Sequence, residues 1–295
     1  MSDEQARRGL AAGVGAFLIW GLMPLYLRLF DGISAGDVLA HRVLWSFVLL
    51  AVATAAIRGW PRLRAALGRP RLLAMLAASG LLIATNWLIY TWAVLNGRTL
   101  DTSLGYFMQP LLNVALGVLL LKEAFPPAKR IAVALAVTGV AIVTIAHGAL
   151  PWVSVGLAFS FGFYGFIRKY TAIDPVTALI VETGFVAPLA AGWLALAPGG
   201  LFRHDFITDA ALVGSGLVSI IPLGMFGFAA RRLSLSTLGM LQYIGPSMVF
   251  LVAVFVFGEP LDIWRLAAFA CIWAGLVVFS IGGLRAAATP IRPRP

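Results

Sequence analysis

The chain has 295 residues, of which 61% are apolar and only 12% are charged, against about 45–50% and about 25% in an average soluble domain. This balance excludes an ordinary soluble globular protein and a disordered chain. The net charge is +10, but the basic residues are scattered between apolar runs, which argues against a nucleic-acid partner. A single cysteine, Cys271, excludes a disulfide framework and a cysteine-ligated metal, and we expect neither metal nor cofactor.

Ten apolar runs are long enough to cross a membrane, since about 20 helical residues match a hydrocarbon core of about 30 Å. The runs are apolar on all sides, which is typical of helices and not of barrel strands. Short joints rich in Gly, Pro and charge separate them. The predicted spans lie at 10–29, 37–57, 71–95, 102–121, 128–147, 151–168, 175–196, 207–230, 235–257 and 263–284. The sequence therefore predicts an all-α integral membrane protein with ten transmembrane helices.

The distribution of Lys and Arg predicts the orientation of these helices. If the N-terminus lies in the cytoplasm, most basic residues fall on the cytoplasmic side, as the positive-inside rule requires. Among the few that then lie near the outer face are Arg28, Arg42 and Arg98. We therefore expect both ends of the chain in the cytoplasm.

A weak internal repeat relates the two halves of the chain. Pro110 and Glu123 have the same spacing as Pro246 and Glu259. At the same offset of 136, Gly139 matches Gly275 and Ala132 matches Ala268; at an offset of 141, Gly15 matches Gly156 and Gly21 matches Gly162. Five helices are an odd number, so the two halves must insert with opposite orientations. We expect a first repeat over 1–148 and a second, inverted repeat over 149–295.

Several stretches resemble a known family. Two stretches are similar to the two EamA repeats of the drug/metabolite transporter superfamily: GYFMQPLLNVALGVLLLKEAFPPAKRIAVALAVTGV and LSTLGMLQYIGPSMVFLVAVFVFGEPL. Four segments resemble the RarD-type subgroup of that superfamily: IWGLMPLYLRLF, AHRVLWSF, LPWVSVGLAFSFGFYGFIRKY and RRLSLSTLGMLQYIGP. The resemblance implies an exporter of small metabolites in the bacterial inner membrane. Because YddG-like amino-acid exporters share the fold, it also implies amino acids as the leading substrate class. A multidrug or toxic-compound exporter and an uncoupled, channel-like facilitator remain alternatives.

Gly and Pro residues in both halves predict hinges beside a binding site, because helix breaks free backbone groups that lipid cannot satisfy. The predicted hinge residues are Pro24, Gly105, Pro110, Gly162, Gly165, Gly239, Gly245 and Pro246. Aromatic and amide side chains near them would suit zwitterionic substrates. The predicted substrate-binding residues are Trp20, His41, Asn86, Tyr90, Tyr106, Gln109, Asn113, Tyr164, Gln242 and Tyr243. The alternative role of the amides is to join helices by hydrogen bonds.

Three acidic residues stand out in or near the predicted spans. Glu182 is the candidate for coupling transport to protons, since an ionisable group inside a span is costly unless it has a role. Interhelical hydrogen bonding is the alternative. At an offset of 141, Glu182 matches His41, and inverted topology then separates the two along the membrane normal. Glu123 and Glu259 fall near helix ends, and we expect them to clamp adjacent helix ends.

The motifs of an enzyme or an ATP-driven pump do not occur. The sequence has no H-E-x-x-H, no G-x-S-x-G and no Walker A motif. We therefore expect a secondary or facilitative transporter that works by alternating access, and not an enzyme. Its expected partners are a small-molecule substrate and the lipid bilayer. A homodimer through the apolar fifth and tenth helices is left open.

Overall fold

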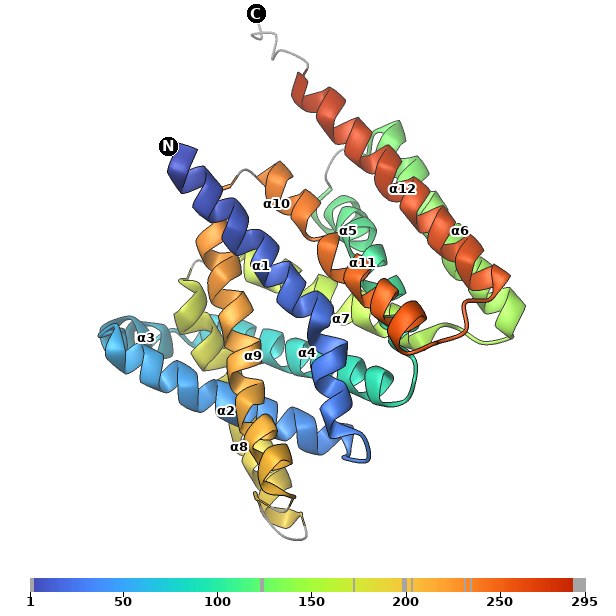
Figure 1. Ribbon diagram of the computed structural model, residues 1–295. Helices are drawn as coiled ribbons and strands as arrows, with labels where there is room; N and C mark the ends of the chain where they lie inside the picture. The colour runs from blue at the N-terminus through green and yellow to red at the C-terminus, as the bar shows by residue number, and fades with distance from the viewer. Residues whose placement is uncertain are drawn as a thin grey trace, which may run out of the picture.

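The computed structural model describes residues 3–122, 125–171, 173–197, 201–202, 204–230, 232–233 and 235–288, and all the regular structure in these ranges is helical. Figure 1 shows a bundle of long helices in which α1 begins and α12 ends on the same side. We call the opposite side the outer side, following the predicted orientation. The helices are α1 (Asp3–Leu27), α2 (Ala35–Ala56), α3 (Trp60–Leu67), α4 (Pro70–Leu95), α5 (Thr99–Leu121), α6 (Pro127–His147), α7 (Trp152–Lys169), α8 (Pro175–Leu196), α9 (Phe206–Ala230), α10 (Leu235–Leu241), α11 (Ile244–Leu251) and α12 (Ile263–Ala288). Two short turns join them: the 3-10 turn η1 (Arg28–Phe30) and the π-helical turn η2 (Val252–Val256).

The predicted spans are recovered with small shifts of their ends. Within the described ranges, eight helices are long and apolar enough to cross a membrane. The 18-residue helix α7 and the segment from α10 to η2 occupy the places of the sixth and ninth predicted spans. The short helix α3 was not predicted; it fills the joint between the second and third spans and exposes Trp60 and Leu67.

Local sequence explains where several helices begin. Ser34 precedes α2 and accepts a hydrogen bond from the backbone N–H of Asp37. Asp174 does the same for α8 through the N–H of Thr177. Both are N-caps that satisfy an otherwise unpaired donor. Proline occupies the first positions of α4, α6 and α8, where its missing N–H costs nothing.

The ninth predicted span is not one helix, because the structure breaks it between Leu241 and Ile244. Pro246 lacks the N–H that would bond to Gln242, four residues earlier, and its ring crowds that carbonyl. The hydroxyl of Ser103 on α5 donates to the carbonyl of Pro246 at 2.8 Å, which ties α5 to the segment after the break. The matching break expected in the fourth span is absent, since α5 runs without interruption past Gly105 and Pro110.

The helices α6 and α12 pack side by side in opposite directions (Figure 1). A Cβ on Gly139 would lie 3.0 Å from the carbonyl oxygen of Ala268, and a Cβ on Gly275 would lie 2.9 Å from that of Ala132. These four residues are the two pairs matched by the repeat. Each half therefore supplies one glycine and one alanine to the same kind of contact, and glycine lets the backbones approach closely.

Two further glycine pairs of the repeat make corresponding contacts. Gly15 on α1 packs against Met225, and its match Gly156 on α7 packs against Ile89. Gly21 packs against Met248, and its match Gly162 packs against Leu112. Met225 and Ile89 are 136 residues apart, and so are Met248 and Leu112.

The contacts between helices show the same correspondence between the two halves. Contact of α1 with α9 corresponds to contact of α7 with α4, and contact of α1 with α11 corresponds to contact of α7 with α5. The pairs α2–α9 and α8–α4 correspond in the same way. Each of these contacts therefore has a counterpart in which helices of the first half are replaced by the matching helices of the second, as in a two-fold relation.

Candidate central site

The centre of the bundle contains a buried positive charge, Arg42 on α2, which is 5% exposed. Its Nε donates to the hydroxyl of Ser219 on α9 at 2.7 Å. Its guanidinium lies over the ring of Trp87 on α4, 4.3 Å from the ring centre. Side chains of α2, α4 and α9 therefore converge on this group. An Arg stacked on an aromatic face gains cation–π stabilisation that increases as water is excluded.

Asn86 joins three helices beside this charge. Its amide nitrogen donates to the carbonyl of Leu157 at 3.1 Å and to the hydroxyl of Ser160 at 2.9 Å, both on α7. Its amide oxygen accepts from the hydroxyl of Tyr106 on α5 at 3.0 Å. Asn86 is fully buried. These bonds correspond to the helix-joining role that was the alternative for the amides, and they also fix the ring of Tyr106 toward the centre.

Three tyrosines lie near the central charge. Tyr26, Tyr90 and Tyr106 are all close enough to interact electrostatically with Arg42, and the rings of Tyr90 and Tyr106 lie 5.8 Å apart. Tyr26 donates to the carbonyl of Ala211 on α9. The hydroxyl of Tyr90 is buried and has no hydrogen-bond partner among the described residues. The centre is therefore aromatic in its walls and rich in donors.

Apolar side chains close the centre toward the outer side. The cluster contains Met23, Leu27, Phe30, Val38, Ala93, Val94, Val153 and Leu212, together with Tyr90 and Leu157. Most of these residues lie near the outer ends of α1, α2, α4, α7 and α9. This cluster thus separates Arg42 and the polar side chains near it from the outer side.

A second buried charge, Glu182 on α8, lies toward the opposite side. It is 1% exposed and accepts a hydrogen bond from the hydroxyl of Ser79 at 2.6 Å. Arg168 at the end of α7 approaches it at 3.7 Å, and Tyr164 lies beside both. Glu182 is therefore paired with a cation across helices, which lowers the cost of burying its charge.

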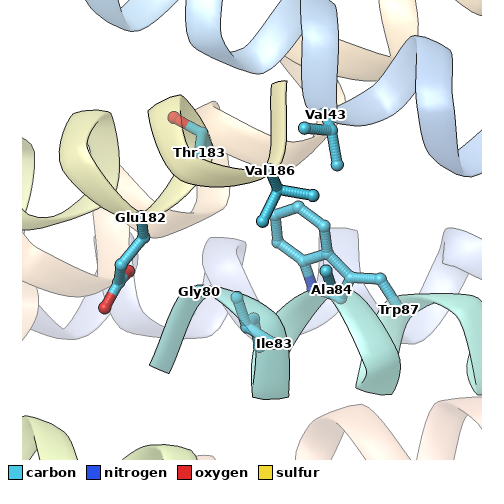
Figure 2. A pocket seen from close by; sticks show the side chains of 8 residues that line it. All are labelled: Val43, Gly80, Ile83, Ala84, Trp87, Glu182, Thr183 and Val186. Carbon is cyan, nitrogen blue, oxygen red and sulfur yellow. The ribbon is translucent and has the colours of Figure 1, made fainter. Parts of the chain in front are cut away.

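The space between Glu182 and Trp87 is small. Figure 2 shows Glu182 beside Gly80 and the indole of Trp87 below Val43 and Val186. The cavity that these side chains line holds only about 10 Å³, which is about the space of one water molecule. Gly80 allows this closeness, since a Cβ there would lie 2.8 Å from the carbonyl oxygen of Glu182.

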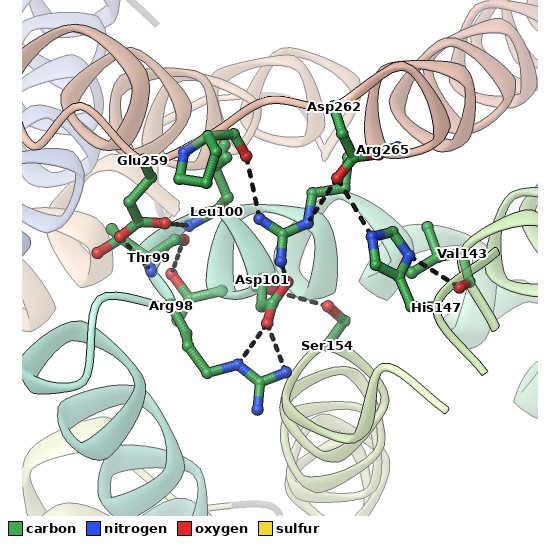
Figure 3. A network of polar contacts seen from close by, with 12 residues as sticks. Arg98, Thr99, Leu100, Asp101, Val143, His147, Ser154, Glu259, Asp262 and Arg265 are labelled. Carbon is green, nitrogen blue, oxygen red and sulfur yellow. Dashed lines mark hydrogen bonds and ion pairs between the residues drawn. The ribbon is translucent and has the colours of Figure 1, made fainter. Parts of the chain in front are cut away.

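A polar network ties the outer ends of the helices together (Figure 3). The carboxylate of Glu259 accepts from the backbone N–H groups of Thr99 and Leu100 at 2.7 and 2.8 Å, and so caps α5. Gly258 before it has φ 65°, a left-handed conformation that suits glycine. The predicted clamp is therefore present, but it holds α5 through backbone amides. Its proposed counterpart Glu123 lies outside the described residues.

Asp101 is the second centre of this outer network. Arg98 binds it at 2.7 Å, Arg265 approaches it at 3.9 Å, and the hydroxyl of Ser154 on α7 donates to its carbonyl oxygen at 2.7 Å. Arg265 also approaches Asp262 at 3.5 Å. The network thus connects α5, α7 and α12.

Asp262 extends this network to α6. His147 at the end of α6 meets Asp262 at 3.2 Å. Slight burial acts to raise the pKa of Asp262, but hydrogen bonds from the backbone of Arg265 and Trp264 and from His147 outweigh it and lower that pKa.

The predicted binding residues do not all meet. Asn86, Tyr90 and Tyr106 come together at the centre, as described. Tyr164 lies with Glu182, and Trp20 packs against Phe17 and Phe226. His41 is buried and accepts from the indole N–H of Trp45 at 3.3 Å.

Two predicted residues face away from the centre. Asn113 is exposed. Tyr243 packs into the cluster formed by α5, α6 and α12, where it meets Ser280. Gln109 and Gln242 are half-buried. Helix faces explain these outcomes, because runs that are apolar on all sides do not reveal which side faces inward.

The predicted hinge residues lie mainly inside continuous helices. Pro24 lies within α1, and Gly162 and Gly165 lie within α7. Gly239 is part of α10, and Gly245 and Pro246 follow the break that starts α11. Their role as hinges stays a prediction.

The most informative central residue was missed in the sequence. Arg42 was counted with the charges near the outer face, yet it lies eight residues into α2 and is buried. A charge inside an apolar run is itself a signal of function. Its partners Trp87 and Ser219 come from distant segments, and no spacing in the sequence joins them.

Comparisons with known proteins agree with this architecture. The EamA-like transporter family matches residues 7–145. "Protein RarD" of Escherichia coli is 40% identical over 283 residues, which cover 95% of this chain and 96% of that protein. "Uncharacterized transporter PA0485" of Pseudomonas aeruginosa is 46% identical over 292 residues, 97% of each chain. A solved crystal structure with 19% identity covers 95% of this chain and 99% of its own, with a TM-score of 0.61, and so shares the fold.

These matches confirm the resemblance seen in the sequence. The relatives span almost the whole chain, and both are similar to it well beyond the first half that the family pattern covers. The apolar helices agree with a protein that crosses the bacterial inner membrane several times. The chain belongs to the EamA-like transporter family and is a RarD-like transporter of the drug/metabolite transporter superfamily.

Proposed function

We propose that this transporter exports amino acids and related small zwitterions by alternating access. The observation that carries the proposal is the central group of Arg42, Asn86, Tyr90 and Tyr106, where polar and aromatic side chains from several helices meet in the membrane interior. Aromatic faces attract ammonium groups, and amide, hydroxyl and guanidinium donors bind carboxylates. Such groups are costly in lipid unless they serve a site.

The proposed division into halves 1–148 and 149–295 supplies the mechanism. Corresponding glycines make corresponding contacts, and α6 and α12 run antiparallel with matched glycine and alanine positions. Two related halves of opposite orientation can exchange conformations around a shared site. In the conformation described, the apolar cluster and the outer network close one side. In the proposed second conformation this side opens.

The test is transport by the pure protein in liposomes. We expect saturable counterflow of several radiolabelled amino acids, with apolar side chains favoured by the aromatic walls. Empty liposomes and liposomes with heat-inactivated protein are the controls. If no amino acid exchanges while a drug-like compound does, amino acids are not the substrate class and the multidrug alternative replaces them. Flux that shows no saturation and no counterflow would favour a channel-like facilitator.

Glu182 is the proposed site of proton coupling. Its carboxylate lies between Ser79 and Arg168 on helices of both halves, so loss of its charge would loosen the contact between α8 and α7. We expect Glu182→Gln to remove the effect of a pH gradient on net transport and to retain counterflow, because exchange needs no net proton movement.

The measurement is uptake with and without an imposed pH gradient. Asp31→Asn is the matched control, since Asp31 is exposed beyond the end of α1. Glu182→Gln transport that still follows the gradient would rule out this coupling role and leave the residue as an interhelical contact.

A further inference from the structure

No acidic side chain of the described residues balances the charge on Arg42. Among the described residues no Asp or Glu lies within ion-pair distance of Arg42, and its neighbours are the hydroxyl of Ser219, the ring of Trp87 and three tyrosines. A guanidinium that is 5% exposed inside a membrane protein is costly without an anion. The neutral contacts offset only part of that cost.

The unused donors near this charge are arranged for an acceptor. Nε of Arg42 is the nitrogen bonded to Ser219, which leaves its two terminal nitrogens for another acceptor. The hydroxyl of Tyr90, also 5% exposed, has no partner either. Trp87 and Tyr90 are three residues apart on α4, hence on one face of that helix. The two terminal N–H groups of a guanidinium match the two oxygens of a carboxylate.

We propose that Arg42 binds the carboxylate of the transported substrate, with Tyr90 donating a further hydrogen bond. This inference rests on the proposed transport through the central group and narrows its substrates to monoanionic carboxylates and zwitterions. The single positive charge of one guanidinium matches one negative charge. The stacked indole of Trp87 holds the guanidinium flat, so its fork is oriented before the substrate arrives.

The first experiment measures binding and does not depend on flux. The thermal unfolding midpoint of the full chain in detergent is recorded with leucine and isovalerate, and with leucinamide and isovaleramide as matched compounds without the carboxylate. We expect the two carboxylates to raise the midpoint and the two amides to leave it unchanged. Arg42→Gln should lose the rise, and Arg42→Lys should keep a weaker one, because an ammonium keeps the charge but not the fork.

Two further variants test the inference without depending on the folding of Arg42→Gln. Tyr90→Phe removes only a hydroxyl that has no partner among the described residues. We therefore expect this variant to fold and to weaken carboxylate binding by about 3- to 10-fold, the usual effect of one hydrogen bond. Arg71→Gln alters an exposed charge near the start of α4 and should bind like wild type. These two keep the inference testable if Arg42→Gln does not fold.

The outcomes separate this inference from the proposed function. Any of three results would overturn the inference. The amides stabilise the protein as strongly as the carboxylates, or the carboxylate effect is unchanged in Tyr90→Phe and Arg42→Lys, or no carboxylate stabilises the protein. If carboxylates bind but no amino acid exchanges in liposomes, the role of Arg42 stands and amino-acid export fails. If leucine and leucinamide exchange equally well, transport stands and the carboxylate anchor is wrong.

Discussion

Replacing Glu259 with alanine should open the outer side of the transporter. Glu259 is 7% exposed, and its carboxylate accepts from the N–H groups of Thr99 and Leu100. Without it, two buried donors lose their acceptor in the closed conformation, at a cost of about 1–3 kcal/mol each. In an open conformation water would hydrate them. A difference of about 2 kcal/mol shifts the balance between the two conformations about thirtyfold toward the open one.

Accessibility of a buried cysteine measures this shift. Val153 at the outer end of α7 is fully buried, so Val153→Cys in a Cys271→Ala background reports opening when a membrane-impermeant maleimide is added from outside. We expect at least about tenfold faster labelling with Glu259→Ala. Glu259→Gln keeps one acceptor and should give an intermediate rate. Equal labelling of all three proteins would mean that Glu259 does not hold the outer side closed.

Leucine at Gly139 or at Gly275 should destabilise the protein severely and to a similar extent. A Cβ at either position meets a backbone carbonyl of the opposite helix at about 3 Å, and a backbone cannot rotate away as a side chain can. Overpacking of this kind costs about 1–3 kcal/mol, and more where nothing yields. We expect a large fall in the unfolding midpoint in detergent or loss of the folded peak on size exclusion.

Gly192→Leu is the matched control for these two variants. Gly192 lies on α8, is exposed and has no neighbour within 4 Å, so leucine there should leave the midpoint unchanged. The two-fold relation predicts similar losses from Gly139→Leu and Gly275→Leu. If only one of them destabilises the protein, the corresponding contacts do not carry equal weight and the relation between the halves is only geometric.

Much of the fold could be predicted because its signal is simple. Long apolar runs with polar joints define membrane helices almost regardless of their neighbours. The interruption expected near Gly239, Gly245 and Pro246 is present as the break after Leu241. The same residue type at Pro110 leaves α5 continuous. Proline weakens a helix at both places, and only the surrounding packing decides whether the helix bends or breaks.

The candidate site could be predicted less completely, for a different physical reason. Asn86, Tyr90 and Tyr106 were recognised as polar or aromatic side chains at helical spacing. Asn113 and Tyr243 have the same character but lie on other faces, because a helix buried among helices and lipid has no polar side to mark its rotation. Arg42 was overlooked since charge was used to orient the helices, and a buried charge was read as one near the surface.

The matched contacts of α6 and α12 bear on how such a chain can originate. Gly139 meets Ala268, and Gly275 meets Ala132, so each half carries both members of a self-complementary surface. A five-helix polypeptide with that surface, inserted into the membrane in both directions, would pair with its own inverted copy through these two glycine–alanine contacts. The present chain has the geometry of such an antiparallel homodimer with its two subunits joined in one polypeptide. After such a fusion each half can diverge. Arg42 can therefore occur in the first half only, and Glu182 in the second half only.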